Sequence, residues 1–408
     1  MIKVILAFIF VLSMTSCARV TEPDDLAYVV AIGIDSKGDT KNFTLQIANP
    51  LKISGGSNES GGEDGKETIS NITVSGENVY QAVNTANHLY SKELSLAHTK
   101  LILISDKIAE EEGLKDFAEF LARSEEIRPN TFLSIVKGDA REYLSEVKPT
   151  NEVNPVKYYE TIFDSDYTSF IPKSTVKDFY CYSMSSERET CLPLSAVKEE
   201  KTKGTLKTEN HGFEEGTKNF KAGEINSQGD IKTETAGMAI LRDTKLVATA
   251  SSKEAELYNI ITGSYLKSET SYFDKNSPGD TVSLMQSQGE KPKIKVDISG
   301  DVPKIYVHLS LEADLRTTKE DYLLENNIGE FENQASEQIK NAALDFLYKT
   351  SRDYKSDIVG FGRYVKRNFK SFDEFEEYDW SKRYEDAEFY IDVDFKLRRS
   401  GLVNRKRG

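Results

Sequence analysis

Residues 26–35 place the strongest constraint on the fold, because this run of Leu-Ala-Tyr-Val-Val-Ala-Ile-Gly-Ile-Asp is apolar almost throughout. A strand with one wet face alternates apolar and polar side chains, and this run does not. Such a run is typical of a strand inside a sheet that is covered on both faces. After a turn at residues 36–39, apolar side chains alternate over residues 43–48, so the two segments predict a hairpin.

Helical and strand periodicities alternate along the region that follows. Apolar side chains recur at helical spacing over residues 79–90, 114–121 and 140–147. Short apolar runs at residues 101–104 and 131–136 indicate buried strands. A sheet with helices packed against it is therefore expected, which is the mixed α/β class.

The second half of the chain repeats this mixture. Residues 237–242 and 245–249 flank Asp243-Thr244 as a hairpin, and residues 254–262 have the pattern of a short helix. Three longer periodic segments follow, which predict a strand, a helix and a half-exposed strand: residues 305–313, 335–347 and 389–397.

Composition suggests how these elements are divided. Residues 149–201 are rich in aromatic side chains and should be folded, whereas residues 201–235 are highly polar and fit a linker or long hairpin loops. We predict an α+β or mixed α/β fold, with mixed sheets packed against helices. The expected parts of the chain are a signal peptide (1–16), an N-terminal domain (17–150), a middle region (151–250) and a C-terminal domain (251–402).

The N-terminal segment has the pattern of an export signal. Lys3 precedes an apolar core at residues 4–11, and small uncharged residues then lead to Cys17. The core is too short to cross a bilayer, which takes about 20 residues. The pattern resembles a bacterial lipobox, in which the cysteine sulfur receives a diacylglycerol group. The alternative is an ordinary secretory signal with an incidental cysteine.

The charge of the chain excludes some partners. Its formal net charge is −14, which argues against nucleic acid because a phosphate backbone requires a basic surface. The same charge argues against adhesion to anionic lipid, so contact with the bilayer would rest on acylated Cys17.

Cysteine and histidine usage gives no support for a metal or catalytic centre. Cys181 and Cys191 either form a disulfide, which export would permit, or remain unpaired. Neither has the companions of a zinc site. The four histidines are scattered: His88, His98, His211 and His308. We therefore expect no enzyme activity, no metal and no cofactor, with His98 serving packing or loop orientation.

Three further features have a structural and a functional interpretation. Asp392 and Asp394 could form a carboxylate pair, but alternation in a strand also places such residues on a solvated face. The Gly360-Phe361-Gly362 sequence allows a turn or a close approach, or a ligand contact. Trp380, the single tryptophan, is by default a core anchor, and the alternative is an interface residue; Phe361 is a second interface candidate.

The order of these pieces resembles the Ger(x)C family of spore germination lipoproteins. Four stretches carry the resemblance: residues 25–35 soon after Cys17; His98-Thr99-Lys100 leading into residues 101–105; the hairpin of residues 237–241 and 245–247; and residues 356–362, followed by Asp379-Trp380 and a closing strand that ends at Gly401.

This resemblance implies a three-domain lipoprotein ectodomain, the lipid-anchored C-subunit of a nutrient germinant receptor on the outer face of the spore inner membrane. It implies two integral membrane subunits as partners and action by protein contact. Two rivals stay open: a lipoprotein solute-binding component of a transporter, which needs two similar lobes around a cleft, and an anchored hydrolase, which needs convergent catalytic groups.

Overall fold

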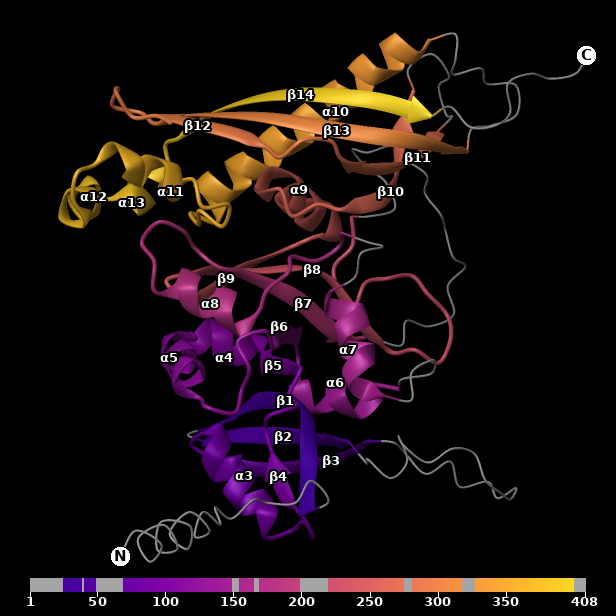
Figure 1. The fold of residues 1–408 in the computed structure, drawn as a ribbon, viewed down its shortest axis with the longest axis vertical. Helices are drawn as coiled ribbons and strands as arrows, with labels where there is room; N and C mark the ends of the chain where they lie inside the picture. Colours follow the sequence, from indigo (N-terminus) through magenta and orange to yellow (C-terminus); the bar gives the residue numbers. More distant parts are fainter. Residues whose placement is uncertain are drawn as a thin grey trace, which may run out of the picture.

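The computed structural model describes residues 25–38, 40–48, 69–148, 154–164, 169–198, 219–274, 281–317 and 327–399. These residues form two mixed sheets that lie at successive positions along the long axis of the molecule (Figure 1). The strands β1 to β9 build the first sheet and β10 to β14 the second. The predicted mixed α/β, multi-domain fold is thus confirmed.

The first sheet has nine strands among the described residues, in the order β3-β2-β1-β5-β6-β7-β8-β9, with β4 also pairing with β1. Strands β1, β5, β6 and β7 run parallel, and the neighbours at both ends are antiparallel. The strands are β1 (Leu26–Lys37), β2 (Thr40–Ala48), β3 (Ile69–Gly76), β4 (Glu93–Ser95), β5 (Leu101–Ser105), β6 (Phe132–Lys137), β7 (Cys191–Val197), β8 (Thr233–Arg242) and β9 (Lys245–Ala250).

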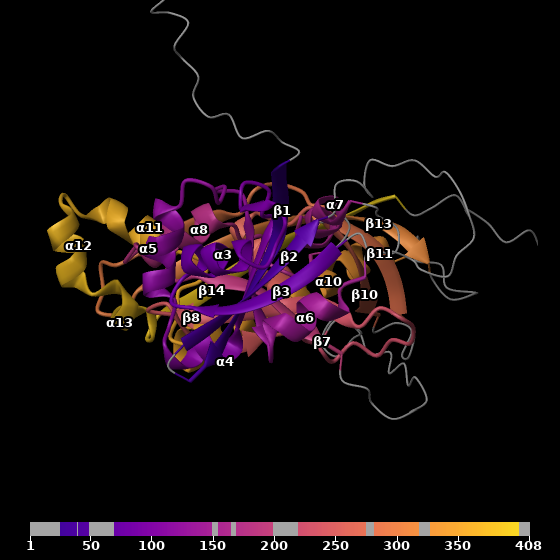
Figure 2. The ribbon, with the colours of Figure 1, turned by 90° about the horizontal axis from the view of Figure 1, so that it is seen from below.

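Strand β1 is covered on both faces, as its apolar sequence predicts. Val29, Ile32 and Ile34 belong to one hydrophobic cluster, whereas Val30 and Ala31 belong to another on the opposite face. The first cluster receives α3 (Val79–Asn87), α4 (Asp106–Glu111), α5 (Lys115–Arg123) and α8 (Val176–Ser183). The second receives α6 (Ala140–Glu146) and α7 (Pro155–Phe163), on the other side of β1 in Figure 2.

Local sequence explains the sharp turns and helix starts. The β8–β9 hairpin turns at Asp243 and Thr244, whose φ angles of 49° and 66° are those of a two-residue hairpin with both central residues left-handed. The helix α9 (Ser252–Thr262) begins with a capping box between Ser251 and Glu254. It ends at Gly263, whose φ of 75° suits a residue without a Cβ.

The second sheet is built around one long strand. Strand β13 (Lys304–Thr317) pairs antiparallel with β11 (Thr281–Gln288) and β12 (Lys293–Asp297) on one side and parallel with β14 (Glu388–Arg399) on the other. Strand β10 (Lys267–Phe273) pairs with β11. The half-exposed alternation predicted for β14 is confirmed, because Phe389, Ile391 and Phe395 are buried whereas Tyr390, Asp392, Asp394 and Lys396 are exposed.

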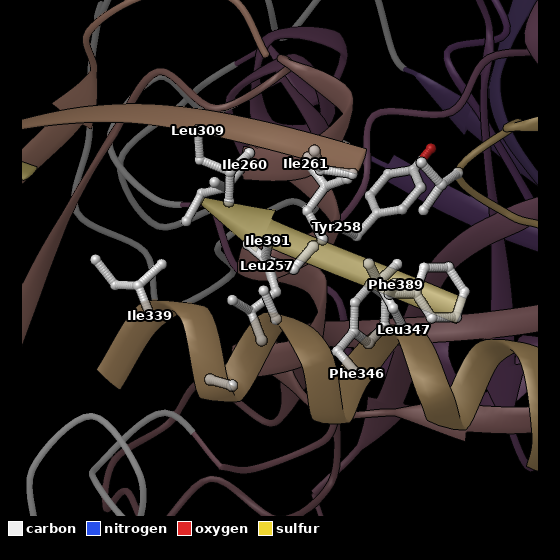
Figure 3. Close-up of a cluster of buried hydrophobic side chains, with 14 of the residues drawn as sticks. Leu257, Tyr258, Ile260, Ile261, Leu309, Ile339, Phe346, Leu347, Phe389 and Ile391 are labelled. Carbon is white, nitrogen blue, oxygen red and sulfur yellow. The ribbon is translucent and has the colours of Figure 1, made fainter. Parts of the chain in front are cut away.

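One face of the second sheet packs against two helices. The long helix α10 (Ile328–Tyr348) presents Ile339, Phe346 and Leu347 to this face, and α9 contributes Leu257, Ile260 and Ile261 (Figure 3). Beyond α10 the chain forms η3 (Lys349–Asp353), α11 (Gly362–Val365), η4 (Lys366–Asn368), α12 (Phe372–Tyr378) and α13 (Trp380–Tyr384) before it enters β14.

Some boundaries differ from the sequence expectation. Helix α3 ends at Asn87, short of residue 90, and α10 begins at Ile328, well before residue 335. The first sheet continues through β7, β8 and β9 across the predicted boundary at residue 150, and the proposed domain limits stay predictions. Among the described residues, no helix combines the length and apolarity needed to cross a membrane.

Candidate functional site

The carboxylate of Asp357, between the two sheets, is only 4% exposed and accepts four hydrogen bonds. The N–H groups of Gly360 and Phe361 donate to its Oδ1 at 2.8 and 3.1 Å. The Gly362 N–H and the indole Nε1 of Trp380 donate to its Oδ2 at 2.9 and 2.8 Å. Burial raises the pKa of the Asp357 carboxyl, and these donors counter that rise because they favour its charged form.

Two glycines allow the chain to wrap around this carboxylate. Gly360 has a φ of 84°, a left-handed value that side chains with a Cβ rarely adopt. A Cβ on Gly362 would lie 2.4 Å from the carbonyl oxygen of Glu187 and 2.6 Å from Cδ1 of Trp380. Both positions therefore require glycine, which explains the Gly-Phe-Gly sequence without a bound ligand.

The same loop is bonded to the first sheet. Ser356 Oγ donates to the carbonyl oxygen of Leu241 in β8 at 2.6 Å, and the Glu189 N–H donates to the Asp357 carbonyl oxygen at 3.0 Å. At the rim, Arg242 and Lys355 both pair with Glu385, at 3.6 and 2.7 Å. We call residues 186–190, 241–243, 354–362 and 379–385 the junction.

A buried cation lies inside the junction. The Arg188 guanidinium stacks over the ring of Tyr182 at 3.9 Å and donates to the hydroxyl of Tyr258 in α9. Its Nε has no hydrogen-bond partner in the described structure. A Cβ added at Gly360 would lie 2.9 Å from Cδ of Arg188, so this side chain lies between the segment before β7, helix α9 and the loop of residues 354–362.

Glu189, next in sequence, gives the junction a pH dependence. Burial raises the pKa of its carboxyl from 4.5 to about 7, and the nearby Asp243 and Asp357 carboxylates add to the rise. The folded state therefore binds the proton more tightly than the unfolded state. Its stabilising effect is complete below about pH 4.5 and is lost as pH rises through about 7.

We expect the Glu189→Gln variant to lose this dependence. The amide oxygen still accepts from the Asp243 N–H, but no proton is exchanged. Between about pH 5 and about pH 8, wild-type stability should fall by about 1–3 kcal/mol more than that of the variant, allowing for the partial exposure of Glu189. Urea unfolding at both pH values measures this, with Glu77→Gln at an exposed position as control. Parallel profiles for wild type and Glu189→Gln would contradict it.

The first two resemblance stretches also meet in the structure. Thr99 Oγ1 donates to the Val29 carbonyl oxygen at 3.2 Å, and the Lys100 N–H donates to that of Val30 at 2.9 Å. Asp35, at the end of β1, accepts from the Ala140 and Arg141 N–H groups at 2.7 and 3.0 Å. His98 packs edge-on against Tyr28 with ring centroids 4.5 Å apart, the packing role expected of it. These contacts hold β1 to the segment before β5 and to the start of α6, so the two stretches serve the packing of the first sheet.

The structure decides between several of the sequence alternatives. Cys181 is exposed on α8 and Cys191 is buried in β7, and both are free, so the disulfide alternative is not supported. Trp380 and Phe361 are 3% and 0% exposed, so both side chains pack inside the chain, which favours the core interpretation of Trp380 and counts against an interface role for either residue. Cys17 and His211 lie outside the described residues.

The remaining polar candidates do not converge. Asp392 pairs with Nδ1 of His308 at 2.8 Å on the outer face of the second sheet, and Asp394 pairs with Lys396 at 3.5 Å. Within the described ranges, no group of three or more His, Cys, Asp or Glu residues could hold a metal ion. Sequence reasoning missed Asp357, Arg188 and Glu189. An aspartate three residues before Gly-x-Gly, as in residues 357–362, is the signal that indicates such a loop.

A cavity of about 500 Å³ lies apart from the junction, at the carboxyl ends of β1 and β5. Its apolar lining includes Ile34, Ile104 and Phe117. Lys41 and Glu112, which also line it, form an ion pair of 2.7 Å. The size and mixed lining suit a small molecule.

Fold and junction together define a multi-domain mixed α/β protein whose buried charges join its two sheets. The family comparison is more specific. Residues 19–197 match the family model "Spore germination protein N-terminal domain", and residues 236–401 match "Spore germination B3/ GerAC like, C-terminal". The chain belongs to this spore germination protein family, the Ger(x)C family, which confirms the resemblance drawn from its four stretches.

Individual relatives extend over nearly the whole chain. Spore germination protein KC of Bacillus subtilis (strain 168) is 26% identical over 98% of this chain and 97% of its own length. Spore germination protein B3 of the same organism is 20% identical over the same shares. The crystal structure of the GerBC protein matches with a TM-score of 0.54 and 16% identity, over 90% of this chain and 96% of that one, which supports the fold.

Proposed function

We propose that this chain is a membrane-anchored subunit of a receptor for small nutrient germinants, needed for spore germination. The observation that carries the proposal is the ordered match of both family models, over residues 19–197 and 236–401. Similarity along almost the full length of two spore germination proteins supports it further.

In this proposal the protein acts by contact and performs no chemical transformation. Its partners are two integral membrane subunits, and its place is the outer face of the spore inner membrane. The junction supports a contact role, because its buried charges are used to join the two sheets into one body. A partner that binds on the side of one sheet can then also displace the other sheet.

Cys17 is the proposed attachment point. A diacylglycerol group bound through a thioether to its sulfur would hold the body at the lipid surface. Each buried CH₂ of such a chain contributes about 0.8 kcal/mol, and two chains give stable attachment. The acidic body, with a net charge of −14, would not bind anionic lipid by charge alone.

The Cys17→Ala variant tests the proposal. We expect the membrane-bound fraction to fall from nearly all of the protein to nearly none, and the germination response of spores to nutrients to be lost or strongly reduced. Cys181→Ala, at an exposed free cysteine, is the matched control and should change neither. Normal fractionation and germination of Cys17→Ala would refute the anchor, and failure to co-purify with an integral membrane partner would refute the receptor role.

The second candidate function is that of a solute-binding component of a transporter. The cavity of about 500 Å³ at the carboxyl ends of β1 and β5 favours it. The different topologies of the two sheets count against it, since that class uses two similar lobes. Calorimetric titration of the purified chain with amino acids and sugars separates the two, because tight stoichiometric binding by this chain alone would favour the transporter role.

A further inference from the structure

The turn between α3 and β4, residues 88–92, lies beside the point where the described chain begins. The first residues of β1 pair with β4, with Leu26 opposite Glu93 and Ala27 opposite Leu94. Both α3 and β4 lie at the end of the molecule opposite the sheet of β10 to β14 (Figure 1). The turn is therefore close to the entry of the N-terminal segment into the fold.

Leu89, in this turn, is 68% exposed, the largest value among the exposed large hydrophobic side chains of the described residues. The apolar face of α3 is already buried through Val79, Ala82, Val83 and Ala86, so Leu89 is not part of that packing. A single exposed leucine is common on soluble proteins and indicates no partner by itself.

The length of chain before β1 supplies the second observation. Leu26 follows Cys17 by nine residues. An extended chain spans at most about 3.6 Å per residue, so the start of β1 stays within roughly 32 Å of the Cys17 sulfur. If that sulfur carries the acyl chains, as the proposed function requires, the end of the body that holds Leu89 cannot leave the vicinity of the bilayer.

We propose that the 88–92 turn is the surface of this protein that contacts the lipid bilayer, with Leu89 inserted at the level of the headgroups. The tether keeps the turn near the membrane, and burial of a leucine side chain in lipid favours the contact by about 10- to 100-fold. The second sheet then faces away from the membrane. This inference rests on the proposed anchor at Cys17 and adds an orientation to it.

The test uses the full-length acylated protein with Cys181 replaced by serine. Leu89→Cys carries a polarity-sensitive fluorophore, and Val302→Cys, 37% exposed in the β12–β13 turn, is the matched control. Both side chains are exposed, so neither change should disturb folding. In vesicles of phosphatidylcholine and phosphatidylglycerol containing spin-labelled lipid, we expect quenching at position 89 to exceed that at position 302 several-fold. Equal quenching at the two positions would overturn the inference.

Flotation and mass spectrometry of the same samples separate the two proposals. If the protein floats with acylated Cys17 but position 89 is not quenched, the orientation fails and the anchor stands. If it does not float, the anchor fails and the orientation fails with it. Protection of position 89 in native spore membranes, without quenching by lipid, would show a protein in place of the bilayer and would also overturn the inference.

Discussion

The Asp357→Ala variant should lose about 3–5 kcal/mol of unfolding free energy, because four donors then remain buried without an acceptor. Loss of the carboxylate also removes a negative charge close to the Arg188 guanidinium. The desolvation cost of the carboxylate is recovered at the same time, which keeps the loss below the sum for four separate hydrogen bonds. Trp380 donates to this carboxylate and is the single tryptophan, so its fluorescence during urea unfolding reports on the junction directly.

Two further variants make this prediction specific. Asp357→Asn keeps the shape but turns one acceptor atom into a donor that faces two N–H groups, so it should recover at most about half of the loss. Asp394→Ala, a change of the same type at an exposed position of β14, should stay within about 0.5 kcal/mol of wild type. Equal stability of Asp357→Ala and Asp394→Ala would mean that the buried carboxylate does not hold the junction together.

The Gly362→Ala variant should lose about 2–3 kcal/mol by overpacking. The added methyl group would lie 2.4 Å from the Glu187 carbonyl oxygen and 2.6 Å from Cδ1 of Trp380, and both neighbours are held by the junction. The clash must be relieved by moving the loop of residues 354–362 away from the segment before β7. Urea unfolding followed by Trp380 fluorescence measures the loss, and limited proteolysis should cut the variant faster at this loop.

Gly329→Ala is the matched control for this change. Gly329 lies in the first turn of α10 with nothing within 4 Å of an added Cβ, so alanine should be neutral or stabilising by about 0.5–1 kcal/mol. If both glycine variants were equally stable, the close approach at Gly362 would not exist in solution.

The sequence was informative where burial follows a simple period. The unbroken apolar run of β1 and the alternation of β13 and β14 identified central and half-exposed strands, because their buried residues, apart from Gly33 and Asp35 in β1, are aliphatic or aromatic. Strand β10 was missed because its buried face carries Ser268 and Thr270 beside Tyr272. Because hydroxyl side chains are polar, a buried face that carries them shows no hydrophobic periodicity in the sequence.

The junction could not be assembled from the sequence for a different reason. Asp357 and Trp380 lie 23 positions apart between α10 and β14, whereas Arg188 lies before β7 and meets them only when the two sheets come together. The Gly360-Phe361-Gly362 sequence indicated a special backbone, but not that its N–H groups surround one carboxylate. The stretches that carried the family resemblance contain many of these hydrogen bonds. The resemblance therefore reflects residues that hold the fold together and not residues of a reactive site.

The parallel pairing of β14 with β13 bears on how the protein is made. His308 and Asp392 are neighbours across these strands although they are 84 positions apart, so the second sheet closes only when almost the whole polypeptide is available. Until then β13 lacks its neighbour on one side, so we expect an incomplete chain to be prone to aggregation. A premature stop anywhere before β14 should therefore yield insoluble or degraded product, not a shortened functional protein.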